Sequence, residues 1–132
     1  MTEKKIEYEE WIEKAEKDLH AAEINLKQSL YEVSAFLSQQ AAEKALKAAY
    51  ILKYKRLWKI HDLEQLGEKV DAPEGIIKIC KELTQHYILT RYPDEEEYAK
   101  EDAEAALKQA KEVIEWSKNR LKKLMENSKQ KK

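Results

Sequence analysis

The sequence has very few of the residues that make turns and cross-links. Its 132 residues include two glycines, two prolines and one cysteine. The single cysteine, Cys80, excludes a disulfide bond within the chain, and its place in the apolar run 76–80 predicts a small buried hydrophobic residue. So few glycines and prolines argue against an architecture of strands and tight turns, because such folds need these residues at most reversals of the chain.

An excess of charge of one sign and long apolar runs are also missing. The 25 basic and 26 acidic residues give a net charge of -1, so any argument for nucleic-acid binding must come from local patches. No stretch approaches the roughly 20 apolar residues that cross a membrane. Charged residues follow Met1 in place of the apolar segment of a signal peptide. We therefore expect a cytoplasmic protein that does not enter the membrane.

Common signatures of metal, cofactor and nucleophile sites are absent from the sequence. The three histidines, His20, His61 and His86, are far apart and lack a short ligand spacing. Gly67 and Gly75 are isolated, so there is no glycine-rich phosphate loop. No nucleophile motif is present. We expect neither a metal ion nor a cofactor.

What the sequence has in abundance is Ala, Leu, Lys and Glu, which are strong helix formers. Apolar residues recur at spacings of three and four. They predict helices over residues 6–30, 31 or 33–54, 62–70, 73–92 and 97–125, with Asp62 as a helix cap and Pro93 as a stop. Long helices with short connections bury their apolar faces on one another. We predict an all-α up-and-down helical bundle of about five helices.

One domain accounts for the chain, with the bundle over residues 1–126 and a polar tail over residues 127–132. The second and last predicted helices carry stripes that are rich in alanine. Small side chains let a neighbouring helix approach closely. If the chain forms a dimer, we expect these small-residue faces to be its interface.

Residues 44–59 combine basic side chains with aromatic rings. The candidate binding residues in and beside this stretch are Lys44, Lys47, Tyr54, Arg56, Trp58 and His61. Basic groups bind phosphate and aromatic faces stack on unpaired bases, so this stretch predicts contact with nucleotides or RNA. Two structural alternatives stay open: the cations complement the dipole at the end of a helix, and Trp58 closes the core.

Arg91 follows the fourth predicted helix and precedes the turn at Pro93. A guanidinium at the end of a bundle suits a phosphate, because its planar donors match phosphate oxygens. The alternative is a salt bridge to Asp94 or to an acid of the first helix, such as Glu16 or Asp18.

His61 directly precedes the helix cap Asp62. Its imidazole could donate a hydrogen bond to a phosphate, or it could hold the connecting segment through a backbone hydrogen bond. Arg56 and His61 are separated by four residues, which is a short pattern that arises often by chance.

Several of these segments together resemble the HEPN family of small helical domains. The resemblance covers nearly the whole chain and is carried by WIEKAEKDL at 11–19, QAAEKALKA at 40–48, HDL at 61–63 and YILTRYPD at 87–94. It implies a helical bundle that forms a homodimer and is associated with nucleotides or RNA. It also implies a minimal nucleotidyltransferase partner, with the pair behaving as a toxin and antitoxin.

Ribonucleases of the HEPN family carry Arg, then four to six intervening residues, then His, at the end of the penultimate helix and the start of the last. The resemblance aligns Arg91 with this Arg, but the positions expected for His hold Glu96, Glu97 and Tyr98. The incomplete motif favours a module that binds nucleotide or RNA without cleaving it. One alternative is a metal-independent ribonuclease in which Arg91 binds phosphate and His61 or Tyr98 transfers the proton. The other is a purely structural helical partner protein.

Overall fold

A computed structural model describes residues 7–89 and 99–130. These residues form five helices and no strand, which confirms the predicted all-α bundle. The helices are α1 (Tyr8–Lys27), α2 (Tyr31–Tyr54), α3 (Leu63–Lys69), α4 (Glu74–Leu89) and α5 (Lys100–Gln130).

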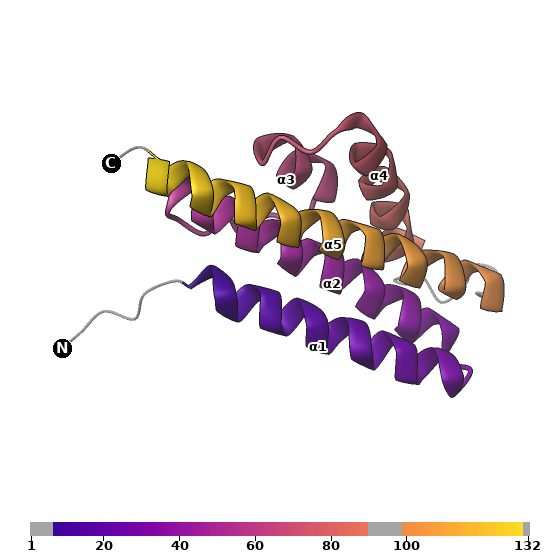
Figure 1. The fold of residues 1–132 in the computed structure, drawn as a ribbon. Coiled ribbons are helices and arrows are strands. Elements are labelled where there is room, and N and C mark those ends of the chain that lie inside the picture. The colour runs from indigo at the N-terminus through magenta and orange to yellow at the C-terminus, as the bar shows by residue number, and fades with distance from the viewer. Residues whose placement is uncertain (1–6, 90–98, 131–132) are drawn as a thin grey trace.

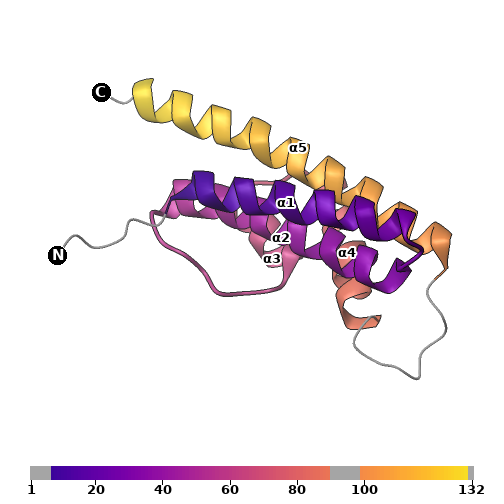
Figure 2. The same ribbon diagram turned by 90° about the horizontal axis from the view of Figure 1, so that it is seen from below.

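Three long helices form the body of the molecule, and the shorter α3 and α4 pack together on one side of it (Figure 1). The first two long helices, α1 and α2, form an antiparallel hairpin, and α5 lies across both and runs in the direction of α2. The segment between α2 and α3 loops out from the end of α2 before it returns to the bundle (Figure 2). This connecting segment, residues 55–62, carries several of the candidate binding residues.

The central helix, α2, contacts all four of the other helices. Every residue from 45 to 51 is buried, which is unusual for a helix that carries charged side chains. Its alanines make this possible, because small side chains let several neighbouring helices approach the same backbone. All six are fully buried: Ala35, Ala41, Ala42, Ala45, Ala48 and Ala49.

The small-residue faces are used inside the protomer. On α5, Ala103, Ala106 and Ala110 are also completely buried. The expectation that these faces form an exposed dimer interface is therefore wrong, because packing of α5 and α1 against α2 already covers them.

The first helix ends earlier than the predicted residue 30. It stops at Lys27, and Ser29 adopts a left-handed conformation with φ of 63°. The Ser29 N–H donates to the Leu26 carbonyl and the Leu30 N–H to the Asn25 carbonyl, which is the hydrogen-bond pattern of a Schellman motif. Glycine normally marks this motif, so a serine in its place gave no sequence signal.

The predicted cap of the third helix is confirmed. The Asp62 carboxylate accepts hydrogen bonds from the backbone N–H groups of Glu64 and Gln65. The last helix is longer than predicted and continues to Gln130. Its final turns are polar, and Lys, Glu and Gln sustain a helix without an apolar face.

The prediction for Cys80 is also confirmed. Its side chain is fully buried, and this burial raises the pKa of the thiol to about 12. Within the described residues, no helix is both long enough and apolar enough to cross a membrane.

Candidate functional site

A pocket of about 490 Å³ lies where α2 ends and the connecting segment begins. We call it the α2-end pocket, and it is lined by Tyr50, Tyr54, Arg56, Leu57, Trp58 and Lys69. Three of the candidate binding residues, Tyr54, Arg56 and Trp58, thus come together. Its size falls within the roughly 300–1,000 Å³ of small-molecule sites. The lining side chains supply two cations and three aromatic rings, and none of them is acidic.

The aromatic rings of the pocket pack on one another. The centroid of the Tyr50 ring lies 4.5 Å from that of Tyr54 and 5.4 Å from that of Trp58. Tyr50 is 4% exposed and forms the buried base of this cluster. Trp58 is partly buried. It packs against the core, as the structural alternative predicts, and it also lines the pocket.

Hydrogen bonds from α2 fix the wall of the pocket formed by the end of α3. The Tyr54 hydroxyl donates to the Lys69 carbonyl oxygen over 3.0 Å, and the Lys53 ammonium donates to the same oxygen over 2.8 Å. These two bonds satisfy a carbonyl at the end of α3 that has no partner within the helix. They also hold the ring of Tyr54 at the pocket.

Asp71 joins this wall to α5. Its carboxylate lies 2.8 Å from Lys53 Nζ and 2.8 Å from a terminal nitrogen of Arg120. The Nε of Arg120 donates to the Val70 carbonyl. The hydrogen bond from Lys53 and the charges of both cations lower the pKa of Asp71. The same hydrogen bond raises the pKa of Lys53. Lys53 and Arg120 are therefore engaged, and the negative charge of Asp71 is compensated.

A second cluster lies nearer the middle of α2, where the buried carboxylate of Glu43 contacts the side chains of Lys47 and His61. Lys47 Nζ lies 2.9 Å from Glu43 Oε2, and these two residues are 5% and 3% exposed. The Lys47 ammonium also lies over the ring of Trp11, 5.7 Å from its centroid. His61 Nδ1 lies 3.2 and 3.1 Å from the two carboxylate oxygens of Glu43.

The Glu43 carboxylate therefore anchors the far end of the connecting segment through His61. This contact holds the connecting segment through a side-chain carboxylate, while the phosphate-binding interpretation of His61 stays a prediction. The His61 side chain is 64% exposed, with Nδ1 in contact with the Glu43 carboxylate.

The candidate binding residues do not converge on one point. Glu43 contacts His61, and it lies eleven residues before Tyr54 on α2. This separation corresponds to about 16 Å at 1.5 Å per residue. Lys44 forms an ion pair with Asp18 of α1, and Lys47 is engaged with Glu43. The Arg56 and His61 side chains thus belong to different clusters despite their short spacing in the sequence.

Arg91 and Tyr98, the remaining candidates, lie outside the described residues, as do Glu96 and Glu97. Among residues 7–89 and 99–130, no group of three or more His, Cys, Asp or Glu side chains could hold a metal ion.

Sequence reasoning missed two important residues, Lys69 and Glu43. Lys69 lines the pocket although it lies fifteen residues after Tyr54, and nothing in the sequence indicates that contact. Glu43 did leave a signal, because it is an acidic residue in the middle of an alanine-rich buried helix. Buried charges are normally paired, so such a position predicts a partner.

The HEPN domain model matches residues 8–121, which is most of the chain. The chain therefore belongs to the HEPN family. A protein of Methanocaldococcus jannaschii with the name "Putative toxin MJ1304" is 34% identical over 134 residues, covering 85% of this chain and 86% of that protein.

Solved structures show the same fold. The protein TT1696 from Thermus thermophilus has a TM-score of 0.78 and 31% identity over 86% of this chain and 97% of its own. The archaeal HEPN homologue ST0689 has a TM-score of 0.74 and 30% identity over the same shares. A HEPN domain protein from Thermotoga maritima has a TM-score of 0.71 at 24% identity, covering 86% of this chain and 98% of its own.

Proposed function

We propose that this HEPN protein is a nucleotide- or RNA-associated module of a toxin–antitoxin-like pair, acting as a homodimer with a minimal nucleotidyltransferase partner. The observation that carries the proposal is the α2-end pocket, where Arg56 and Lys69 stand beside the partly buried ring of Trp58. Cations bind the phosphate of a nucleotide, and an aromatic face stacks on its base. The toxin named among its relatives supports the toxin–antitoxin part of the proposal.

A thermal-shift screen tests nucleotide association. The purified protein is heated with ATP, GTP, other mononucleotides and short RNA in EDTA, next to Arg56→Ala, Trp58→Ala and Arg91→Ala. We expect a ligand to raise the melting temperature because it binds only the folded state. Loss of the shift in Arg56→Ala and Trp58→Ala assigns binding to the α2-end pocket, whereas loss only in Arg91→Ala assigns it elsewhere. No shift with any ligand contradicts nucleotide association.

The homodimer and the partner protein are tested separately. For a homodimer, light scattering should give a particle mass of twice the 15.6 kDa of one chain. Co-expression with a candidate minimal nucleotidyltransferase should yield a stable complex. A strictly monomeric protein that forms no complex would contradict the homodimer and the partner role, and would leave only the nucleotide site.

A second candidate function is metal-independent ribonuclease activity with Arg91 as the phosphate-binding residue. The observation in its favour is the buried Glu43 carboxylate, which holds His61 Nδ1 and so orients an exposed imidazole. A fixed imidazole is suited to proton transfer near neutral pH. Tyr98 is the other candidate for this step.

RNA cleavage in EDTA distinguishes the two functions. A ribonuclease should lose cleavage in Arg91→Ala, and in either His61→Asn or Tyr98→Phe. Full cleavage by Arg91→Ala, or none by the unmodified protein, argues against this activity. The binding function predicts a ligand-dependent thermal shift in the absence of cleavage.

A further inference from the structure

We propose that the α2-end pocket is an anchoring site for single-stranded nucleic acid, remote from the position of the family's ribonuclease motif. This inference rests on the proposed function and narrows it from any nucleotide to an extended strand. Three features of the structure carry it: the distance of the pocket from the start of α5, the number of cations around it, and its exposed aromatic edge.

The pocket lies at the opposite end of the bundle from the start of α5. Arg120 contacts Val70 and Asp71, which directly follow the pocket residue Lys69. From Lys100, where α5 begins, to Arg120 is twenty residues, or about 30 Å of helix. The ends of α2 and α5 lie together in Figure 1, far from the first turn of α5. The family's motif falls just before that first turn in the sequence, so one mononucleotide cannot occupy both places.

The pocket has more cations around it than a mononucleotide needs. Arg56 and Lys69 line it, and Lys55 and Lys59 lie on the same connecting segment. All four side chains are exposed, and none forms an ion pair with another described residue. A row of unpaired cations matches the repeated phosphates of a strand. The nearby acid, Asp71, is already bound by two other cations and does not oppose them.

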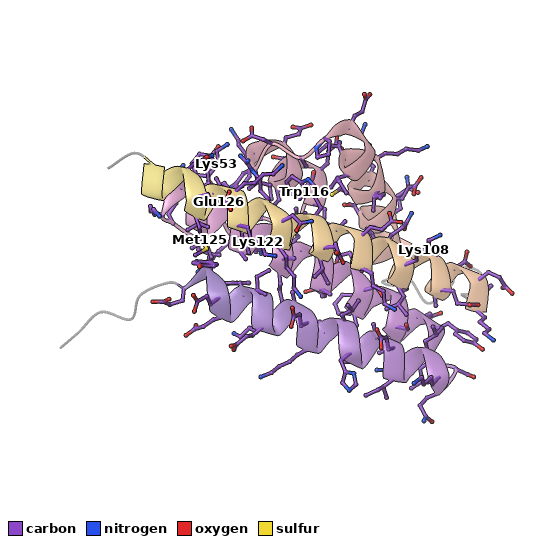
Figure 3. The ribbon with its side chains drawn as sticks, viewed as in Figure 1. Lys53, Lys108, Trp116, Lys122, Met125 and Glu126 are labelled. Carbon is purple, nitrogen blue, oxygen red and sulfur yellow. The ribbon has the colours of Figure 1, made fainter. Side chains whose placement is uncertain are left out.

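Two lysines of α5 lie toward the same end of the bundle. Lys122 and Lys123 are exposed on the C-terminal half of α5, and neither forms an ion pair with another described residue. Figure 3 shows Lys122 toward the same end of the bundle as Lys53, whose ammonium donates a hydrogen bond to the Lys69 carbonyl at the pocket. The two lysines of α5 add positive charge at this end of the bundle.

The aromatic cluster favours unpaired bases. A base stacked in a duplex presents only its edges, whereas a base in a single strand presents a face to an aromatic ring. The ring of Tyr54 already contacts Tyr50 and the ammonium of Lys53. Trp58 is partly exposed at the pocket, so we assign it the role of stacking platform.

The test is fluorescence anisotropy in EDTA with labelled oligouridine and oligothymidine of about ten nucleotides, a length within the range of single-strand sites. A duplex of equal length and unlabelled UMP and AMP serve as competitors. We expect the single strands to bind and both competitors to be weak. RNA bound more tightly than DNA would indicate recognition of the ribose hydroxyl, and equal binding would indicate recognition of stacking and charge only.

Variants locate the site. Trp58→Ala should weaken binding by about 5- to 150-fold, which is the range for one stacked base. Arg56→Gln with Lys69→Gln should reduce the slope of log affinity against log salt by about 1.4, or 0.7 for each lost phosphate contact. The matched control is Lys78→Gln with Lys108→Gln, which removes two exposed cations elsewhere, on α4 and at the far part of α5 (Figure 3). The control should change the slope much less.

Each outcome decides something. Equal effects of the pocket and control double variants would overturn the site, while nucleic-acid association itself would stand. Tight binding of UMP or AMP with no preference for strands would overturn the anchoring role and leave the proposed nucleotide association intact. Absence of binding by any probe would overturn both. If Trp58→Ala fails to fold, the double variant at Arg56 and Lys69 still decides, because both residues are exposed.

Discussion

The buried ion pair of Glu43 and Lys47 leads to a specific prediction about stability. In Glu43→Met, the Lys47 ammonium stays buried, with the Trp11 ring but no carboxylate to balance its charge. In Lys47→Met, Glu43 retains His61 as a partner. The first variant should therefore be the less stable of the two. The double variant removes both charges and keeps unbranched side chains of similar length.

The magnitude follows from the burial of both groups, which are 3% and 5% exposed. Removing one partner of a buried ion pair typically costs about 3–5 kcal/mol, because the remaining charge is left without compensation. Replacing both by apolar side chains is often neutral, or stabilising by about 1–4 kcal/mol. We expect Glu43→Met to lose about 3–5 kcal/mol, Lys47→Met to lose less, and the double variant to recover most of the loss.

Urea unfolding at pH 7 measures these differences. Circular dichroism follows the helices, and tryptophan fluorescence follows Trp11 next to the pair together with Trp58 and Trp116. The double variant completes a thermodynamic cycle that isolates the coupling between the two charges. A loss below about 1 kcal/mol in Glu43→Met, or a double variant as unstable as that single variant, would refute the argument that burial makes the lone charge costly.

Three further predictions concern other parts of the bundle. Because burial raises the pKa of Cys80 to about 12, its thiol should resist alkylation at pH 8 until the protein is unfolded; rapid labelling of the native protein, measured by mass spectrometry, would contradict this. The pKa of Asp71 is lowered in the folded state, so its contribution is present above the unfolded value near 3.9 and is lost as pH falls through the folded value. Asp71→Asn should thus lower stability at pH 7 by about 1 kcal/mol or less, since the pair is exposed, and the difference should vanish in acid in pH-dependent melting curves. At Gly67 an added Cβ would lie 2.9 Å from Ile77 Cδ1, whereas at Gly75 it meets nothing within 4 Å. Gly75→Ala should therefore stabilise by about 0.4–1 kcal/mol and Gly67→Ala should gain less or destabilise; the reverse order in calorimetry would count against the packing argument.

The sequence alone determined the helical architecture of this protein. Apolar spacing and the scarcity of glycine and proline predicted five helices, and the Asp62 cap and the burial of Cys80 are local consequences of residue type. The segments at 11–19, 40–48, 61–63 and 87–94 also indicated the HEPN family, which the match over residues 8–121 confirms. These features depend on neighbours close in the chain, so the sequence carries them directly.

The composition of the candidate site was only partly predictable. Tyr54, Arg56 and Trp58 are close in sequence, so it follows that all three line one pocket. Their partner Lys69 comes from another helix, and Lys47 proved to be buried with Glu43 instead of lying on the surface. Whether a lysine faces solvent or a buried carboxylate depends on which helices cover it.

Tertiary structure also decided which surfaces are available. The alanine faces of α2 and α5 could have bound a second chain, but α1, α2 and α5 use them to pack on one another. Ser29 ends α1 in a conformation that favours glycine, and hydrogen bonds to Leu26 and Asn25 hold that turn. Both outcomes depend on contacts between chain segments, whose free energy no single segment of sequence determines. The sequence specified which residues could bind, pack or carry charge, and the packing of five helices decided which of them do so together.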